Sequence, residues 1–402
     1  MTIVFPQSTD SIENICIEKR VIAPFSDVLV DFVDDVSKHI LNESTFKQYP
    51  ELMALAFWMR RGHIKKLQYY FMQKQGTKLL LGRGIVFHLA PSNVDTIFIY
   101  SWFLSLLVGN SNIVRISDKK NIQTDLLLKV LTLILQQHKY EELQTRVGII
   151  RYGHDDEVTS YLSRMADTRV IWGGDRTIEH IRTIPIKATA TELTFADKFS
   201  FAIIDSKTLC EEKKLMLLIK KFYNDTFWFG QMACSSIRSI VWVGSKEDNI
   251  QAKNRFWNAL ETYVKQQLPE EITPADIINK LVAECSMAIE QDGIVTKMDT
   301  PYINRIQIED LSQANTHLHC GTGLFYECEV DGLSEVFQHI SKKYQTIAYY
   351  GFEKEVLFAA LQQTLPYGID RVVPIGKSLE FSHVWDGYDL FESFCREVEV
   401  WS

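Results

Sequence analysis

The chain has 402 residues, enough for two packed domains, because domains usually run to roughly 100–200 residues. Hydrophobic residues make up 46% of the sequence and charged residues 23%, which is typical of globular proteins and argues against a disordered chain. The formal net charge of −8 argues against bulk binding to nucleic acid or to an anionic membrane, since neither polyanion would attract the chain over long range.

The predicted elements begin with a helical segment that extends to about residue 76. Its apolar residues recur at three-to-four spacing, as at Phe25, Val28, Leu29 and Phe32. Strands then alternate with helices. Strands are expected at 84–90, 112–116, 147–151 and 169–172, and helices before Gly109 and at 121–138 and 156–165. The alternation predicts βαβ units and a mainly parallel sheet, which binds ligands at the carboxyl ends of its strands.

A second α/β series starts after about residue 196. It opens with a strand at 199–204, a helix at about 207–224 and a strand at 236–243. No linker rich in proline, glycine or serine marks the change. We therefore place a domain boundary near residue 196 on the change of phase alone.

The seven cysteines are scattered and form no CxxC pair, so the sequence predicts neither a zinc site nor a disulfide framework. The amino-terminal residues lack the basic start and apolar run of a signal peptide. No stretch approaches the ~18 uninterrupted apolar residues of a membrane helix. We therefore expect a reduced, cytoplasmic protein with no metal and no integral membrane segment.

Cys234 is the first candidate for chemistry. It lies among small residues, between a predicted helix and the β-branched run at 239–243, in a turn where a thiolate would stay reachable. The alternative is a buried small hydrophobic side chain, the usual fate of a lone cysteine. Cys320 is the second candidate, and the other cysteines lack such a setting.

Two further segments follow predicted strands. Asn93 comes after Pro91 and Ser92, where its amide would either donate to a developing oxyanion or cap a helix. Gly173 and Gly174 end the strand at 169–172 and fit either the close approach of a cofactor or a plain turn. Neither a GxGxxG fingerprint nor a Walker motif occurs in the sequence.

Taken together and in this order, the segments resemble the acyl-CoA reductase family, typified by the fatty-acid reductase subunit of bacterial bioluminescence. The resemblance covers about residues 80–402. The matching runs are 84–94, 106–115, 172–175, 231–236, 345–346, 368–376 and 385–388. The resemblance implies an aldehyde-dehydrogenase-like α/β fold, with two Rossmann-like domains and a helical N-terminal segment.

The resemblance also assigns the domains. Residues 1–196 would hold the helical segment and the nicotinamide cofactor-binding domain, and residues 197–365 the catalytic domain with the nucleophilic cysteine. Residues 366–402 would form a tail that packs back on the cofactor domain or at an oligomer interface.

The implied reaction reduces an acyl thioester to an aldehyde through an acyl group on Cys234, with Asn93 as an oxyanion donor. Glu192 matches the general base of the aldehyde dehydrogenases, but the double glycine that follows that base is missing here; a solvated or capping glutamate is the alternative. The gap from Gln231 to Cys234 is also one residue longer than in those enzymes. Reduction needs no activated water, so a missing base is tolerable.

NADPH is the expected hydride donor, with NADH as the alternative. Arg115, Lys119 and Lys120 would hold a 2′-phosphate, whereas Asp118 would bind the free ribose hydroxyl of NADH. The full set of expected cofactor contacts is Pro91, Ser92, Arg115, Ser117, Lys119, Gly173 and Gly174.

The implied partners are acyl-CoA or another acyl-carrier thioester, an acyl-protein synthetase, and further copies of the chain in a homo-oligomer. Nucleic acid is not expected. Two other functions stay open: acyl transfer from Cys234 without redox chemistry, and a non-catalytic scaffold of the same fold. Loss of Cys234 or Asn93 would have indicated the scaffold, and both are present.

Overall fold

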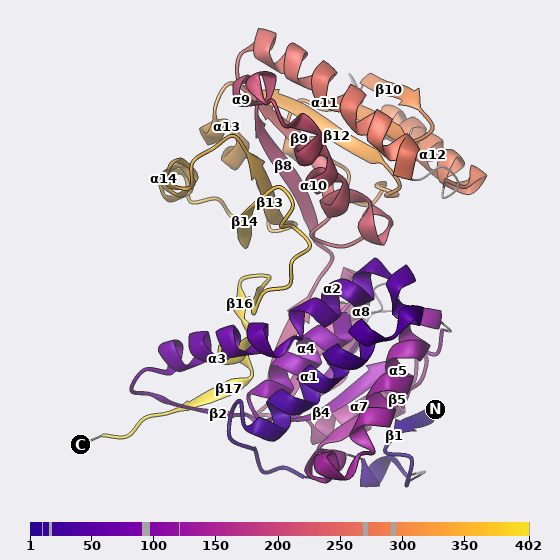
Figure 1. Cartoon of the computed structure of the whole chain (residues 1–402), viewed down its shortest axis with the longest axis vertical. Coiled ribbons are helices and arrows are strands. Elements are labelled where there is room, and N and C mark those ends of the chain that lie inside the picture. Colours follow the sequence, from indigo (N-terminus) through magenta and orange to yellow (C-terminus); the bar gives the residue numbers. More distant parts are fainter. Residues whose placement is uncertain are drawn as a thin grey trace. The chain divides into compact units, whose positions relative to one another are not determined.

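The computed structural model describes residues 1–9, 11–15, 18–90, 97–119, 121–267, 272–290 and 295–401. The chain divides into two compact units (Figure 1). The first comprises Met1–Asp197 and Phe381–Ser402, and the second Lys198–Glu380. The expected tail at 366–402 is thus divided between the units.

The first unit opens with a short strand, β1 (Thr2–Phe5), which was not predicted. The expected helical segment follows as three helices, α1 (Asp27–Asn42), α2 (Pro50–Trp58) and α3 (Arg61–Gln75). In α1 the buried residues include Leu29, Val33, Val36 and Ile40, the spacing of one helix face. That face packs on α2 and on helices of the sheet that follows.

The first sheet has the strand order β1-β5-β4-β3-β6-β7, and every pair is parallel except that of β1. Its other strands are β3 (Ile85–Leu89), β4 (Ser111–Ile116), β5 (Val147–Arg151), β6 (Thr168–Trp172) and β7 (Thr191–Phe195). The connecting helices are α4 (Ile97–Leu107), α5 (Ile122–Leu135), α6 (Glu141–Gln144), α7 (Asp156–Met165) and α8 (Asp175–Arg182). The chain runs outward from β3 to β5 and returns on the other side of β3 as β6. The strand order therefore reverses between β3 and β6, where open α/β sheets bind their ligands.

The carboxyl-terminal segment returns to the first unit. It contains β15 (Val384–Trp385), β16 (Tyr388–Asp389), α15 (Leu390–Ser393) and β17 (Cys395–Val398). Strand β17 pairs antiparallel with β2 (Leu79–Gly82). Buried Asn110, which lies just before β4, stabilises this segment, because its side-chain amide donates a hydrogen bond to the Phe394 carbonyl at 3.0 Å.

The second unit is built around a seven-stranded sheet of order β10-β11-β12-β9-β8-β13-β14, parallel except for β10. Its strands are β8 (Phe199–Asp205), β9 (Ile237–Val243), β10 (Val295–Thr300), β11 (Ile303–Gln307), β12 (Leu324–Val330), β13 (Tyr344–Tyr350) and β14 (Arg371–Pro374). Its helices are α9 (Ser206–Glu211), α10 (Leu215–Phe227), α11 (Lys246–Gln267), α12 (Pro274–Glu290), α13 (Leu333–Gln338) and α14 (Lys354–Thr364).

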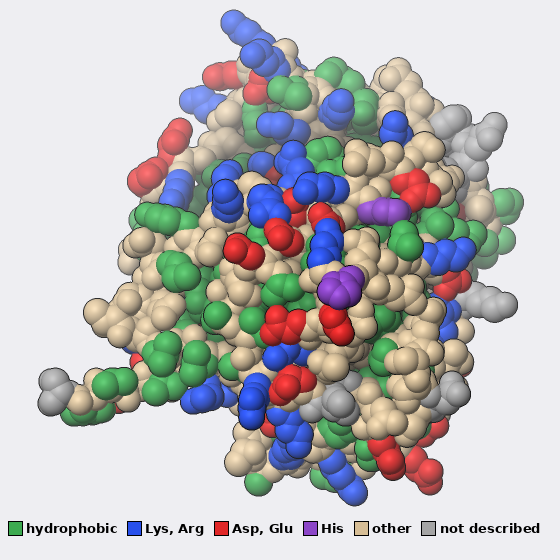
Figure 2. Space-filling view, turned by 60° about the horizontal axis from the view of Figure 1, so that its bottom comes forward, with side chains coloured by type: hydrophobic (Ala, Val, Ile, Leu, Met, Phe, Trp, Pro, Cys, Tyr) green, Lys and Arg blue, Asp and Glu red, His purple; other side chains and the backbone are tan. Residues whose placement is uncertain are grey.

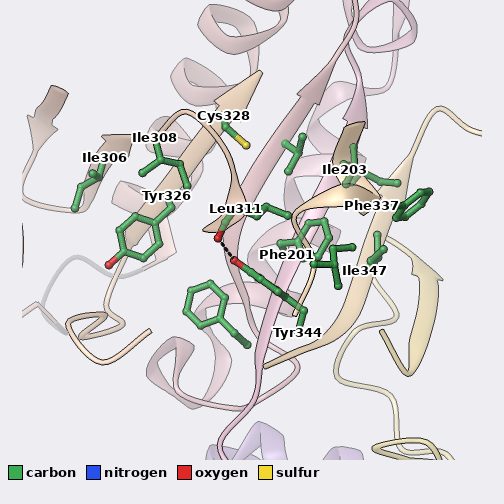
Figure 3. Packing of buried hydrophobic residues seen from close by; sticks show 14 of the residues in the cluster. Phe201, Ile203, Ile306, Ile308, Leu311, Tyr326, Cys328, Phe337, Tyr344 and Ile347 are labelled. Carbon is green, nitrogen blue, oxygen red and sulfur yellow. Dashed lines mark hydrogen bonds between the residues drawn. The ribbon is translucent and has the colours of Figure 1, made fainter. Parts of the chain in front are cut away.

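Side chains alternate across this sheet, so each strand contributes to two cores. Phe201 and Ile203 of β8 enter one core, while Ala202 and Ile204 enter the other. Figure 3 shows the first core, in which the Tyr344 hydroxyl donates to the Leu311 carbonyl at 2.5 Å. Burial of both sheet faces is typical of a parallel sheet between helices.

The surface carries mixed charge, with acidic and basic side chains interspersed over the face in Figure 2. Within the described part of the chain, no helix is both long enough and apolar enough to cross a membrane.

Asp225 of α10 anchors the turn after β14. Its carboxylate accepts hydrogen bonds from the backbone N–H groups of Gly376, at 2.5 Å, and Ser378, at 3.1 Å. Burial outweighs these bonds and raises the pKa of Asp225 from 3.8 to about 6.

Asp225 should make stability depend on pH. Between pH 3.8 and about 6 the folded state keeps a proton that the unfolded state has released, so this contribution to stability is lost as the pH rises. Asp225→Asn removes the titration. The unfolding free energy of the variant minus that of the wild type should therefore increase by about 2–3 kcal/mol between pH 4 and pH 7. Urea unfolding at both pH values measures it. The exposed Asp331→Asn is the control, and a pH-independent difference for Asp225→Asn would contradict the prediction.

Candidate functional site

Cys234 lies in the loop between the 3-10 turn η4 (Trp228–Gln231) and β9, with its side chain half-buried. Cys328 and Cys395 are buried, and burial raises the pKa of both thiols to about 12. Burial also raises the pKa of Cys320 and of Cys210. Since the thiolate is the nucleophile, these four are poorly suited to attack.

The backbone before Cys234 is unusual, because Phe229, Gly230 and Gln231 have φ angles of 56°, 58° and 65°. Only glycine adopts this left-handed region without cost, so Phe229 and Gln231 must be held there. The buried Gln231 side chain supplies part of that hold. Its amide nitrogen donates to the carbonyls of Ile237 and Leu324, both at 3.0 Å, and its oxygen accepts from the Gly323 N–H at 2.8 Å.

Arg238 and Ser200 hold the rest of the loop. The guanidinium of Arg238 donates to the carbonyls of residues 231, 232 and 233 at 3.1, 2.9 and 3.4 Å. The Ser200 hydroxyl donates to the Cys234 carbonyl at 2.7 Å. Four successive carbonyls are therefore fixed, and the thiol is presented from a rigid loop.

The thiol stands at the amino end of β9. The neighbouring strands β8 and β13 contribute Ser200 and Gln345 at the same end, and the Gln345 amide nitrogen lies 3.5 Å from the Cys234 sulfur. The expectation that ligands gather at the carboxyl ends of strands does not describe this edge. In the first unit the candidate pocket does lie at the carboxyl ends of the strands.

A pocket in the first unit lies at the carboxyl ends of β3, β4, β5 and β6, across the reversal of strand order. Its cavity volume is about 40 Å³. Its lining includes Ala90, Arg115, Tyr152, Gly153, Trp172 and Thr177. Its position fits a nucleotide site of the doubly wound type, with Arg115 as the cation and Asp155 and Asp156 as the acidic residues of the lining.

Arg115 forms one wall of this pocket. Its guanidinium donates to the carbonyls of Gly153, at 2.9 Å, and Ala90, at 3.4 Å, and lies 5.2 Å from the centre of the Tyr152 ring. Burial lowers the pKa of Arg115 below its usual value. Its buried Nε has no hydrogen-bond partner among the described residues, and a buried donor of this kind fits an anionic ligand.

Ser117 and Lys119 follow β4 at the same edge, and the Lys119 N–H donates to the Ser117 hydroxyl at 3.3 Å. The Asp118 carboxylate turns toward Gly153, since a Cβ added to that glycine would stand 2.6 Å from Asp118 Oδ2. Lys119 is exposed. The predicted site residues Pro91, Ser92, Asn93 and Lys120 lie outside the described residues.

Gly173 and Gly174 connect β6 to α8, with Gly174 as the residue before the helix. A Cβ on Gly173 would approach the Thr177 side chain to 3.2 Å, whereas a Cβ on Gly174 would meet nothing within 4 Å. The open space at Gly174 leaves the start of α8 accessible. Since helix N-termini favour anions, this end suits a phosphate group of the ligand.

Glu192 lies in β7, and both of its carboxylate oxygens are engaged. One accepts from Arg169, through Nε at 2.8 Å and through Nη2, and the other accepts from Arg182 at 2.9 Å. The Arg169 side chain is only 2% exposed, so Glu192 neutralises a buried charge. The general-base role of Glu192 stays a prediction, and these ion pairs favour a structural role.

Some residues near the two sites were not assigned a role from the sequence. Tyr152, Gly153 and Thr177 line the pocket, and the available signal was a glycine just after a predicted strand. Ser200 had no local signal, because it contacts Cys234 only across neighbouring strands.

Histidine and metal chemistry have little support in the described residues. No group of three or more histidine, cysteine, aspartate or glutamate side chains is placed there to hold a metal ion. His319 is buried, and burial lowers its pKa to about 3, with nearby Arg238 acting in the same direction.

Replacing Glu192 separates the two roles. In Glu192→Gln, buried Arg169 loses its charged partner, so the unfolding free energy should fall by about 1–3 kcal/mol while activity per folded molecule changes less than about twofold. Chemical unfolding and initial rates measure the two effects. Exposed Glu179→Gln is the matched control. A hundredfold loss of activity with unchanged stability would support the general base instead.

Comparison with known proteins agrees with this geometry. The sequence model described as acyl-CoA reductase (LuxC) matches residues 59–397. No curated protein matches the sequence.

Solved structures with a similar fold include a point mutant of Thermus thermophilus 1-pyrroline-5-carboxylate dehydrogenase, with a TM-score of 0.65 and 10% identity over 92% of this chain and 80% of that one. Lactaldehyde dehydrogenase from Escherichia coli has a TM-score of 0.64 and 12% identity, over 92% and 85%. A Mycobacterium tuberculosis aldehyde dehydrogenase complexed with NAD+ has a TM-score of 0.62 and 11% identity, over 94% and 86%.

These identities show the fold alone, whereas the family model covers most of the chain. The predicted family, fold class and enzyme class are confirmed. The chain belongs to the acyl-CoA reductase (LuxC) family and is an oxidoreductase with the fold of the aldehyde dehydrogenases.

Proposed function

We propose that the protein reduces an acyl thioester to an aldehyde through an acyl intermediate on Cys234, with NADPH as the hydride donor. The observation that carries the proposal is the half-buried thiol of Cys234 on a loop whose four successive carbonyls are held by Arg238 and Ser200. A nucleophile that is both reachable and fixed is what acyl transfer to cysteine requires. Family membership supplies the reductive direction.

In the first step the Cys234 thiolate attacks the thioester carbonyl, and a new C–S bond forms as the carbonyl oxygen becomes negative. The Asn93 side chain and the Cys234 backbone N–H are the proposed donors to that oxyanion, each typically worth about 2.7–4 kcal/mol of barrier. The bond to the carrier sulfur then breaks, and the carrier leaves with the electron pair and takes up a proton. The acyl group stays on Cys234 as a new thioester.

The second step regenerates the free Cys234 thiolate. A reduced nicotinamide, when bound, would supply the hydride that brings the acyl carbon to the aldehyde oxidation level. The C–S bond breaks, Cys234 leaves as a thiolate, and the aldehyde is released. No water is activated in this direction, so the reaction does not need Glu192 as a base.

The pocket of the first unit is the proposed cofactor site. Arg115 lines it at the end of β4, and Trp172 and Thr177 line it on either side of Gly173 and Gly174. Ser117, Lys119, Gly173 and Gly174 are proposed as further contacts of the cofactor. Pro91 and Ser92 complete the proposed set. The proposal of NADPH rests on Arg115 and Lys119, whose positive charges would favour a 2′-phosphate over the Asp118 carboxylate, which lies beside Gly153 and acts on Arg115.

The proposed substrate is acyl-CoA or an acyl-carrier thioester in the cytoplasm. An acyl-protein synthetase as donor and a homo-oligomeric enzyme are further proposals from the family resemblance. The domain assignment at 1–196, 197–365 and 366–402 also remains a proposal.

Cys234 should carry the acyl group. Incubation with an acyl-CoA in the absence of reductant is expected to leave an adduct on Cys234 that hydroxylamine removes, because a thioester is cleaved by that nucleophile. Peptide mass spectrometry locates the adduct. Cys234→Ala should abolish it, and exposed Cys285→Ala should leave it unchanged.

An adduct on Cys320 or Cys285 would contradict the assignment. In the same assay Asn93→Ala should slow adduct formation by ~10²–10³ if its amide serves the oxyanion. Formation of the adduct without any oxidation of NADPH or NADH would point to acyl transfer without redox chemistry.

NADPH should be the preferred cofactor. We expect the ratio of kcat/KM with NADPH to kcat/KM with NADH to exceed one, and to fall about tenfold in Arg115→Ala and less in exposed Lys119→Ala. The ratio isolates the 2′-phosphate, because loss of the Arg115 bonds to Gly153 and Ala90 would weaken both cofactors alike. Lys129→Ala, exposed on α5, is the control. A higher kcat/KM with NADH in the wild type would overturn the preference.

A further inference from the structure

Gln345 reaches Cys234 from a strand that is distant in sequence. It is the second residue of β13, and its neighbour Tyr344 is fixed in the core of the second unit through the bond to the Leu311 carbonyl (Figure 3). The pairing of β13 with β8 is irregular between Tyr344 and Ile347, and both of these residues enter the same core, so Gln345 lies in the irregular stretch between two anchored side chains. Gln345 is itself only 3% exposed, so its amide has little freedom to move.

The Gln345 amide nitrogen donates to the Cys234 sulfur at 3.5 Å. The Thr346 hydroxyl donates to the Gln345 amide oxygen at 3.3 Å, which leaves the amide nitrogen turned toward the sulfur. A thiolate accepts hydrogen bonds and cannot donate one. The ionised form of Cys234 therefore selects the same orientation of the amide.

A second chain of hydrogen bonds connects β13 and β8 to the backbone of Cys234. The Thr346 N–H donates to the Ser200 hydroxyl at 3.2 Å, and that hydroxyl donates to the Cys234 carbonyl at 2.7 Å. Residues 345 and 346 thus hold Cys234 at two points, through its sulfur and through its carbonyl. A two-point hold fixes the direction of the Cα–Cβ–S arm as well as its position.

We propose that Gln345 is a positioning residue for Cys234, whose amide holds the sulfur in place and favours its thiolate. The inference rests on the proposed role of Cys234 as nucleophile. A hydrogen bond to the charged form of a group stabilises that form, so the donor raises the fraction of thiolate ready to attack. The same donor stabilises the sulfur as it leaves in the second step, because a better stabilised thiolate is a better leaving group.

The test is the pH profile of Cys234 alkylation by iodoacetamide, followed on the Cys234 peptide by mass spectrometry. Gln345→Met keeps the approximate length of the side chain and removes the donor. Its profile midpoint should rise by about one pH unit, and the rate at pH 7 should fall about five- to tenfold. The rate on the high-pH plateau should be retained or increased, since a less stabilised thiolate is more nucleophilic.

Thr346→Val, which removes only the hydroxyl that orients the amide, should move the midpoint in the same direction by less. It also carries the test if Gln345→Met does not fold. Gln363→Met, exposed on α14, is the matched control and should leave the profile unchanged. A merely structural role would lower or raise the whole profile without moving the midpoint, and that result would overturn the inference.

Failure of this inference is distinguishable from failure of the proposed function. Alkylation needs no acyl substrate, so the midpoint reports on Gln345 even if Cys234 is never acylated. An unmoved midpoint in both variants, together with a normal acyl adduct on Cys234, would reject Gln345 alone. An active wild-type enzyme without the adduct would reject the nucleophile, whatever the midpoint shows.

Discussion

Two left-handed turns packed against each other carry the loop of Cys234. The turn at 229–231 has three positive φ angles in succession, and the segment at 321–323 has three more, of 75°, 51° and 90°. The Thr322 N–H donates to the Gly230 carbonyl, and the Gly323 N–H donates to Gln231. A Cβ on Gly321 would come within 2.4 Å of the Gly230 carbonyl oxygen, and one on Gly323 within 2.0 Å of the Tyr302 oxygen. Glycine is therefore required where the turns meet, and the position of the thiol depends on that contact.

The first unit has a comparable constraint beneath its pocket, made of buried polar groups. His88 of β3 contacts the Ser101 hydroxyl of α4 at 3.1 Å and the Asn112 side chain of β4 at 3.0 Å. The Trp172 indole of β6 donates to the same hydroxyl at 3.3 Å. Burial lowers the pKa of His88 to about 4, so the ring is neutral near pH 7 and both of its nitrogens find partners. Three adjacent strands are fixed to one helix just below the edge that forms the pocket, and a fully satisfied network of this kind favours one arrangement.

The candidate site residues of the two units lie at opposite ends of their strands. Arg115, Tyr152 and Trp172 reach the pocket from the carboxyl ends of the first sheet, while Ser200, Cys234 and Gln345 gather at the amino ends of the second. Glu192 belongs to neither group, since its carboxylate neutralises buried Arg169 at the margin of the first sheet. In the proposed function, cofactor binding and nucleophilic attack therefore fall to different units.

The sequence by itself determined the elements, the class of fold and the family. Hydrophobic periods of two and of three to four residues are local signals, and the strands predicted from them correspond to β3, β4, β5, β6, β8 and β9. Strand β7 and helix α8 were not predicted, and the helix expected at 207–224 is divided into α9 and α10. The small residues around Cys234 are local as well. The family could be recognised because several such runs keep their order along the chain, and each run survives as a short stretch of sequence.

Tertiary structure alone decided which residues meet. Gln345 stands 111 residues from Cys234 and contacts it only because β13 and β9 lie on either side of β8. The same reasoning holds for Glu192 and Arg169, which face each other through the register of β6 and β7, and for the carboxylate of Asp118 beside Gly153. Strand order and register are set by long-range packing of both sheet faces, and no local pattern encodes them. The chemistry of a residue type could therefore be anticipated from sequence, but its partners could not.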